Sequence, residues 1–406
     1  MRKPHYAWAV CLGCTLMLLV SGGLSVNAFS VTQPYILKQG GFTNTQTSMI
    51  TTVRAVTYLL CMFLSPRFFR RTGYRLGTAI ATALSGAAFL IFAFARTLPV
   101  YYAAGAVAGL SYGLGSMIPA TILMNHWFHR QRGLAIGLCS AGTGLGMVLL
   151  SPVLTLLCER FGLKVCFLAE AVFSLLCAAL VFLLVRESPE RCGLRPCGEG
   201  ELEEKRRARP VQPVPELRPL RWMMLCLAAV LLGAIASPGP SHLMILYTTA
   251  GIPETSAAMA VSLFGLALML GKCVYGAACD RFGGWRTDWL FGAALCAGLA
   301  LCTLAGSRSI PLMLLAAALY GFGVALSTVG LAIWAGDFGG EARADTLVQR
   351  FQLCYGIGGL ALSTMPGMFA DWTGSYAPAY LVLLACAVYS LLAVQSTYCL
   401  KQRVGP

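Results

Sequence analysis

The chain has 406 residues, of which 57% are hydrophobic and only 11% are charged, and its mean hydropathy is +0.72. Soluble domains carry roughly 25% charged residues, so the composition excludes an ordinary soluble protein and indicates a chain that spans a membrane. The formal net charge of +14 would also suit a nucleic-acid-binding protein, but the placement of the charges, described below, removes the need for such a partner.

Apolar stretches of spanning length recur along the chain, about twelve in all and about six on each side of a polar segment. The first of them is too long for the apolar region of a signal peptide, so we interpret it as a transmembrane helix. The stretches are 7–31, 45–66, 76–95, 98–122, 133–157, 164–185, 221–247, 256–279, 287–306, 310–335, 346–370 and 376–398. The pattern predicts an all-α integral membrane protein of two pseudo-symmetric six-helix bundles.

Residues 186–219 differ in composition from the rest, with a run of acidic and basic side chains and several prolines. This segment is typical of a mobile linker. We therefore expect an N-terminal bundle over 1–185, a cytosolic linker over 186–219 and a C-terminal bundle over 220–406.

The positive charges are distributed unequally between the two sides of the predicted membrane. With the N-terminus inside, the outside loops hold only a few of the 30 Lys and Arg residues. These are Lys38, Arg96, Arg160, Lys164 and Arg308. The asymmetry follows the positive-inside rule and predicts that both termini are cytoplasmic. Together with the many cysteines it fits a bacterial inner membrane, and we expect a monomer.

The cysteines predict neither a disulfide framework nor a metal site. Most of the 17 lie in apolar stretches, where they act as small hydrophobic side chains. Cys192 and Cys197 lie together in the polar segment, but further ligands at zinc-site spacing do not follow. We expect no metal, no cofactor and no enzymatic activity, since motifs such as GxSxG or HExxH are also lacking in a suitable context.

The two halves repeat weakly in one loop. Arg70–Arg75 follows the second stretch and Asp280–Arg286 follows the eighth, with Gly73 and Gly283 in corresponding places. Gly276, Asp280, Arg281 and Gly283 stand at the spacing GxxxDRxG, which resembles the loop signature of the major facilitator superfamily. In the first half, Arg70 stands where the family has an aspartate, so a latch between the halves built on that carboxylate is not expected here.

A second resemblance is narrower. Residues 125–137 (NHWFHRQRGLAIG) and 141–146 (AGTGLG) resemble the region of the fourth and fifth spans in the oxalate/formate antiporter and monocarboxylate transporter group. The resemblance implies transport of a small carboxylate by alternating access between two halves. Read without the family, the aromatic residues suit a membrane interface and the glycines suit close helix packing, so this segment identifies the fold rather than the site.

Two cations fall inside predicted spans: Arg54 in the second and Lys272 in the eighth. A charge at that depth costs at least ~2.5–3.5 kcal/mol and usually faces a cavity or a partner. Snorkelling to the surface is one alternative, although Lys272 lies about 12 Å by helix rise from Asp280 at the span's end. An ion pair that only stabilises packing is another, and Glu170 is the single acid expected clearly inside a span. We favour an anion site, with Arg54 and Lys272 holding a carboxylate from two sides.

The resemblance does not carry over at every site residue. Lys272 stands where oxalate-type relatives have an arginine, and residues 352–356 contain no cation where those relatives have a lysine. Leu268 stands where proton-coupled monocarboxylate relatives have an aspartate. Oxalate specificity and that proton-coupling device are therefore not expected, and exchange of one anion for another or facilitated movement is favoured over uptake driven by an ion gradient.

Other polar or aromatic residues on the spans predicted to line a cavity are weaker candidates for substrate contact, and ordinary interhelical hydrogen bonds explain each of them as well. They are Asn27, Tyr112, His242, Tyr320, Gln352 and Tyr355, with Ser241 beside them. Pro238 and Pro240 predict a hinge or a static kink in the seventh span, because a proline frees a backbone carbonyl. We assign Asp280, Arg281 and Gly283 to conformational gating with this proline pair.

The favoured hypothesis is a secondary transporter of a small mono- or dicarboxylate, with a coupling proton or a counter-anion as its second partner. One alternative is a transporter of the same fold for a neutral or cationic compound, including drug efflux, although such carriers usually need an intramembrane acid and only Glu170 offers one. A second alternative, of another class, is a transport-inactive membrane sensor that presents its linker to a partner.

Overall fold

The computed structural model describes residues 5–40, 42, 44–198 and 217–404, and every regular element among them is a helix. Ten helical segments of this described part are long and apolar enough to cross a membrane. One of these, Met49–Phe94, holds two predicted spans, and the predicted span 287–306 falls on α14 (Gly284–Thr303), which is not among the ten. The difference from the predicted count arises at these two places.

The chain divides into two compact units. One comprises Met1–Arg130 and Leu138–Glu199, and the other comprises Gln131–Gly137 and Gly200–Pro406. The division therefore falls within the predicted linker and also within helix α6 (Arg132–Leu145), whose first turn groups with the second unit.

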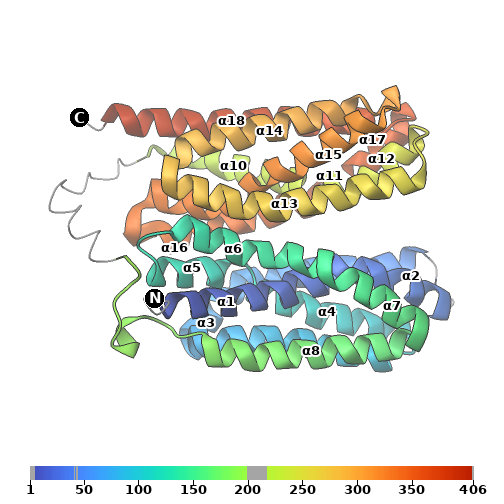
Figure 1. The fold of residues 1–406 in the computed structure, drawn as a ribbon, viewed down its shortest axis with the longest axis horizontal. Helices are drawn as coiled ribbons and strands as arrows, with labels where there is room; N and C mark the ends of the chain where they lie inside the picture. Colours follow the sequence, from blue (N-terminus) through green and yellow to red (C-terminus); the bar gives the residue numbers. More distant parts are fainter. Residues whose placement is uncertain (1–4, 41, 43, 199–216, 405–406) are drawn as a thin grey trace. The chain divides into compact units, whose positions relative to one another are not determined.

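In unit 1 the long helix α3 packs along α4 and α8, and α1 also lies against α8 (Figure 1). Besides α6, the helices are α1 (Ala7–Leu18), η1 (Leu19–Ala28), α2 (Phe29–Gly40), α3 (Asn44–Phe94), α4 (Leu98–Leu114), α5 (Met117–Trp127), η2 (Gly146–Leu150), α7 (Ser151–Phe161), α8 (Leu163–Leu184) and the short η3 (Glu190–Cys192).

In unit 2, α13 and α14 both pack on α15, while α10 packs on α16 and α18 (Figure 1). Besides α14, the helices are α10 (Pro219–Ala236), α11 (Pro238–Ser241), α12 (Leu243–Thr249), α13 (Glu254–Phe282), η4 (Ala305–Ser307), α15 (Ile310–Ala325), η5 (Leu326–Gly330), α16 (Leu331–Ala361), α17 (Met365–Thr373) and α18 (Ala377–Val404).

The predicted spans are less regular than their hydropathy suggests. The first, fifth and tenth contain the π-helical stretches η1, η2 and η5. The fourth is interrupted at Gly115, between α4 and α5, and the seventh at Ser237, before Pro238. Such breaks leave backbone carbonyls outside the regular helical ladder, and within a membrane these groups need other donors.

The loop repeat noticed in the sequence has the same backbone conformation in both copies. Gly73 has φ 71° and ψ 167°, and Gly283 has φ 81° and ψ 158°. This region is open essentially to glycine alone. In the first half, helical residues continue on both sides of Gly73, so α3 contains the predicted spans 45–66 and 76–95 with a reversal between them.

The first part of the predicted linker is held against unit 1. The backbone N–H of Cys197 donates to the carbonyl of Trp127, and the carbonyl of Cys197 accepts from His129 and Arg130. The indole N–H of Trp127 donates to the carbonyl of Arg186 over 3.0 Å. Residues 186–198 are therefore anchored to the α5–α6 junction, whereas the prediction of mobility for 199–216 lies outside the described residues.

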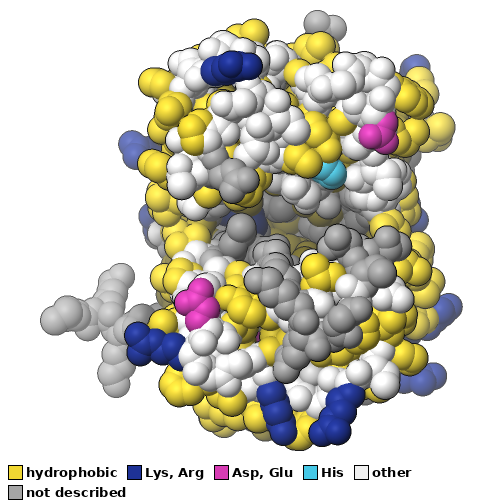
Figure 2. Space-filling model, turned by 90° about the vertical axis from the view of Figure 1, so that its right-hand side faces the viewer, with side chains coloured by type: hydrophobic (Ala, Val, Ile, Leu, Met, Phe, Trp, Pro, Cys, Tyr) yellow, Lys and Arg dark blue, Asp and Glu magenta, His cyan; other side chains and the backbone are white. Residues whose placement is uncertain are grey.

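Large hydrophobic side chains are exposed on both units, as lipid contact requires. Leu183 of α8 is 58% exposed and Leu290 of α14 is 63% exposed. Figure 2 looks onto the helix ends, where hydrophobic side chains lie mainly toward the edges and charged groups are scattered. An apolar exterior with few charges is the expected surface of a protein dissolved in a bilayer.

Candidate functional site

Arg54 lies in α3 and points at the break in the first span. One guanidinium nitrogen, Nη1, donates to the backbone carbonyl of Ser25 in η1 over 2.6 Å. The guanidinium carbon lies 5.0 Å from the ring centre of Phe29, a cation–π distance. Ser25 lies in the last third of the first span, so the guanidinium contacts the backbone of that span, and the anion-site interpretation of Arg54 stays a prediction.

The predicted candidates Asn27 and Tyr112 lie in the same unit as Arg54. Tyr112 of α4 is within electrostatic range of the Arg54 guanidinium and stacks on Tyr58 of α3, with ring centres 4.4 Å apart. The amide of Asn27 donates to the carbonyl of Thr143 over 3.0 Å. Arg54 and Asn27 thus both satisfy backbone carbonyls, and for Asn27 an interhelical hydrogen bond is the role that the structure shows.

The two π-helical stretches of unit 1 cross at glycines. A Cβ added at Gly23 of η1 would lie 2.9 Å from the Cα of Gly146 in η2, and one added at Gly146 would lie 2.5 Å from the Cα of Gly23. Only glycine permits this approach, as small-residue membrane interfaces require. Asn27 and its partner Thr143 flank the crossing, so the broken segment next to Arg54 is held on this side as well.

Lys272 is buried in α13, with 4% of its surface exposed. Gly271, immediately before it, packs on the backbone of Phe322 in α15, where an added Cβ would lie 2.8 Å from the carbonyl oxygen. The carbonyl of Lys272 itself faces Gly137 in the first turns of α6, at 2.4 Å from an ideal Cβ. The backbone of α13 is therefore closely packed on both sides of Lys272.

The break at Pro238 and Pro240 is braced by tyrosines. The hydroxyl of Tyr320 donates to the carbonyl of Ile235 over 2.5 Å, and that of Tyr380 donates to the carbonyl of Gly239 over 2.7 Å. Nδ1 of His242 lies 2.8 Å from the carbonyl oxygen of Pro238. Tyr320 is fully buried, so its observed role is to complete the kinked helix rather than to face an open cavity.

Gln352 and Tyr355 lie one turn apart in α16. Gln352 is 5% exposed, and its amide nitrogen has no hydrogen-bond partner among the described residues. The backbone of Tyr355 packs directly on Gly233 of α10. A buried amide without an acceptor is costly, which keeps Gln352 among the candidates for substrate contact.

Asp280, at the end of α13, binds the start of α6. Its two carboxylate oxygens accept hydrogen bonds from the backbone N–H groups of Gly133 and Leu134, each over 2.8 Å. These amides belong to the first turn of a helix, where donors lack intrahelical partners and the helix dipole favours an anion. Arg281 next to it contacts the ring of Phe282. Of the predicted gating residues, Asp280 therefore has a defined contact between two helices.

Sequence reasoning missed a second buried acid. Asp288 is fully buried in α14, and its carboxylate accepts from the hydroxyl of Tyr275 over 2.5 Å and from the indole N–H of Trp334 over 2.7 Å. Glu170 is therefore not the only buried acid among the described residues, although Asp288 lies at the edge of the predicted span 287–306. Asp288 lies at the start of its span, next to polar residues, and its donors come from two other helices, α13 and α16.

Glu170 itself does not form the ion pair considered from the sequence within unit 1. It is 2% exposed in α8, and neither carboxylate oxygen accepts a hydrogen bond from a described residue. Within the predicted spans of unit 1, the cation Arg54 and the acid Glu170 therefore do not form an ion pair with each other.

Comparison with known proteins gives relatives along most of the chain. Monocarboxylate transporter 12 of Mus musculus is 22% identical over 95% of this chain and 84% of its own length. The membrane sensor protein UhpC of Salmonella typhimurium is 23% identical over 71% of this chain and 65% of its own length. The hexuronate transporter of Bacillus subtilis is 28% identical over 43% of this chain and 42% of its own length.

The fold also matches solved transporters. The human organic anion transporter MFSD10 (TETRAN) superimposes with a TM-score of 0.72 over 97% of this chain and 100% of that chain, at 14% identity. The family model described as Major Facilitator Superfamily matches residues 14–250, more than half of the chain. The chain is a multi-pass membrane protein that belongs to the major facilitator superfamily.

Proposed function

We propose that this chain is a secondary transporter that moves a small organic anion, a mono- or dicarboxylate, by alternating access. The observation that carries the proposal is the setting of Arg54. It lies inside a span, its contacts are a backbone carbonyl and aromatic rings, and no carboxylate among the described residues forms an ion pair with it. A guanidinium in this setting is available for a planar, bidentate contact with a carboxylate.

The π-helical stretch η1, which Arg54 contacts, links substrate binding to a change in the shape of the first span. We propose that a bound carboxylate draws the guanidinium away from η1, so that the Ser25 carbonyl loses its donor. Since an unsatisfied carbonyl in a membrane is costly, η1 then changes its geometry or recruits another donor. Substrate binding and the shape of the first span are thereby coupled, as alternating access requires.

Lys272 supplies the second cation of the proposed site. It lies in the eighth predicted span, which corresponds by the sequence repeat to the second span, which carries Arg54. We propose that Gln352 adds a neutral donor, and that Asp280 with the Pro238–Pro240 break takes part in gating. Cytoplasmic termini and a monomeric state belong to the same proposal.

The relatives support a carboxylate and also name the main rival. Monocarboxylate transporter 12 and the hexuronate transporter bear names of acidic substrates. UhpC bears the name of a sensor, so a transport-inactive sensor is the second candidate. The anchoring of residues 186–198 on unit 1 through Cys197 would serve such a role. Transport by the purified protein in vesicles separates the two.

The first test is thermal unfolding of the purified protein with formate, pyruvate, oxalate, succinate and glucuronate. A ligand at about 100 times its dissociation constant stabilises the native state by roughly 2.7 kcal/mol. We expect at least one carboxylate to raise the melting temperature of the parent and of Arg308→Ala, but not of Arg54→Ala or Lys272→Ala. Arg308 is a matched control because its guanidinium also donates to a backbone carbonyl, that of Ala250, outside the spans.

Two results would overturn the anion site. One is that no carboxylate of the panel stabilises the parent. The other is that Arg54→Ala and Lys272→Ala respond to a carboxylate as strongly as the parent does.

A further inference from the structure

Glu170 has no stabilising partner in the part of the chain that the structure describes. It lies in the first half of α8, 2% exposed, and neither carboxylate oxygen has a hydrogen-bond partner among the described residues. Buried polar side chains are nearly always hydrogen-bonded, so an isolated carboxyl calls for a physical explanation. Its backbone is ordinary, with the carbonyl accepting from Ser174 one turn later.

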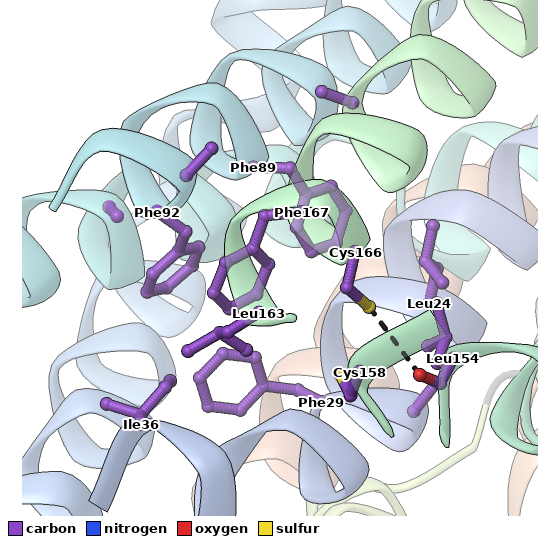
Figure 3. Close-up of a cluster of buried hydrophobic side chains, with 14 of the residues drawn as sticks. Leu24, Phe29, Ile36, Phe89, Phe92, Leu154, Cys158, Leu163, Cys166 and Phe167 are labelled. Carbon is purple, nitrogen blue, oxygen red and sulfur yellow. Dashed lines mark hydrogen bonds between the residues drawn. The ribbon is translucent and has the colours of Figure 1, made fainter. Parts of the chain in front are cut away.

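The surroundings of Glu170 are apolar. One turn earlier in α8, Cys166 and Phe167 belong to a hydrophobic cluster that includes Phe89, Phe29 and Leu24 (Figure 3). The groups that interact electrostatically with Glu170 are the thiols of Cys158 on α7 and Cys166 on α8.

The charged groups that the structure describes on the neighbouring helices contact other side chains or are exposed. Glu159 and Arg160 of α7 are exposed, and the ammonium of Lys164 lies 4.9 Å from the ring centre of Phe94. On α3, the guanidinium of Arg75 lies over the ring of Phe182. The helix α1 has no charged residue. On α2, the titratable group described near Cys158 and Cys166 is Tyr35. None of these groups is a cation paired with Glu170.

An ionised carboxyl in this setting would be prohibitively unstable. Transfer of an isolated carboxylate into an apolar medium costs many kcal/mol, and such a group binds a proton instead. Asp288 is the contrasting case, because two donors, Tyr275 and Trp334, satisfy its oxygens. Asp288 links three helices through its hydrogen bonds, whereas the carboxyl of Glu170 accepts no hydrogen bond from the residues that the structure describes.

Glu170 is joined to the proposed anion site by one structural element. η1 contacts α8, which carries Glu170, and its Ser25 carbonyl receives the hydrogen bond from Arg54. The cluster in Figure 3 contains Leu24 of η1 and Phe29, the ring beneath Arg54. A change in η1 caused by loss of the Arg54 contact is thus transmitted to the packing around Glu170.

We propose that Glu170 is a proton-binding site coupled through η1 to the anion site at Arg54, so that the substrate anion moves together with a proton. The inference rests on the proposed transport function and adds its coupling ion. For a monocarboxylate, charge balances in each cycle: one proton bound at Glu170 accompanies one negative charge bound at Arg54, and both are released on the other side. A dicarboxylate carried with one proton moves one net negative charge. This mechanism replaces the anion exchange that the sequence favoured.

Infrared spectroscopy tests the site without a substrate. In the purified parent we expect the carbonyl band of a protonated carboxyl at neutral pH, and its loss as the pH is raised. The band should be absent from Glu170→Gln and present in Glu159→Gln, whose exposed acid is the matched control. Because Glu170 is held in its neutral form, Glu170→Gln should fold normally. A parent without a band assignable to Glu170, or a band that stays unchanged at every pH at which the protein is folded, overturns the proposal.

Transport in proteoliposomes tests the coupling. With labelled pyruvate or glucuronate, both monocarboxylates, outside, a gradient of one pH unit sustains up to about tenfold accumulation if one proton moves per anion. We expect Glu170→Gln to lose this accumulation and to keep exchange of labelled for unlabelled anion, with Glu170→Asp partly restoring it. Equal gradient-driven accumulation by Glu170→Gln and the parent refutes the coupling.

The two measurements separate the two proposals. If no carboxylate moves in the parent, the transport function fails as stated. The infrared titration then still decides whether Glu170 exchanges a proton, since it requires no substrate.

Discussion

Asp280 should protect two backbone amides of α6 from hydrogen exchange, and replacing Asp280 should speed the exchange of both. In α6, Ala135 is the first residue of the turn whose N–H donates to a preceding carbonyl, that of Gln131. The amides of Gly133 and Leu134 precede it and donate to the two oxygens of Asp280 instead, each over 2.8 Å. After Asp280→Ala, neither amide has this partner.

The size of the effect follows from the number and kind of bonds lost. A hydrogen bond to a charged group contributes about 1.5–3 kcal/mol. The carboxylate is solvent-accessible, so the lower part of that range applies to the pair as a whole. Because about 1.4 kcal/mol corresponds to a factor of ten in an equilibrium constant, the amides of Gly133 and Leu134 should exchange roughly ten- to a hundredfold faster in Asp280→Ala.

Hydrogen–deuterium exchange with residue-level mass spectrometry measures these two amides directly. Arg281→Ala is the matched control, because its exposed guanidinium contacts only the ring of Phe282 among the contacts described for it. Exchange at residues 133–134 should be as slow in this control as in the parent. Unchanged exchange in Asp280→Ala would refute the assignment of Asp280 as the cap of α6.

Two further predictions concern packing and are measured as unfolding free energies in detergent. Gly358→Ala should destabilise the protein by about 1–3 kcal/mol through overpacking, since the added Cβ would lie 1.8 Å from the carbonyl oxygen of Val230. Gly265→Ala is the control and should cost no stability, because a Cβ added there has no neighbouring atom within 4 Å. Tyr275→Phe should cost about 1–3 kcal/mol, because it leaves one oxygen of the buried Asp288 without its donor; stability equal to the parent would show that this oxygen finds another donor.

Hydropathy and the glycine-containing loops predicted much of the fold. Each predicted span falls on helical residues, because length and apolar character alone decide whether a segment can cross a bilayer. The conformation shared by Gly73 and Gly283 follows from residue type, since the reversal there requires glycine. The superfamily could therefore be identified from local patterns.

The internal breaks and their partners could not be predicted in the same way. Nothing in the composition of residues 19–28 distinguishes a π-helix from an α-helix, because the choice depends on how η1 packs against Gly146. The partner of Arg54 is a backbone carbonyl, which no residue type reveals. Asp288 was missed because its burial depends on Tyr275 and Trp334, which are distant in sequence and come together only in the folded unit.

Different kinds of hydrogen-bond donor satisfy the backbone carbonyls of the two broken spans, and this difference bears on function. In the seventh span, neutral hydroxyls of Tyr320 and Tyr380 donate to the carbonyls of Ile235 and Gly239. In the first span, the corresponding donor, to the carbonyl of Ser25 in the π-helical stretch, is the charged Arg54. A neutral donor therefore suffices for the structural task, and the charge of Arg54, which costs at least ~2.5–3.5 kcal/mol to insert, needs another reason to be there.

Arg54→Gln separates the structural task from the charge. The glutamine amide keeps an N–H donor for the Ser25 carbonyl, whereas Arg54→Ala removes it and should cost about 1–3 kcal/mol for the group left unsatisfied. If the charge serves an anion, Arg54→Gln unfolds at or above the temperature of the parent and shows no shift with the stabilising carboxylate. A response to the carboxylate as large as that of the parent would mean that the guanidinium only braces η1, and the anion would then have to be held by other groups, Lys272 first among them.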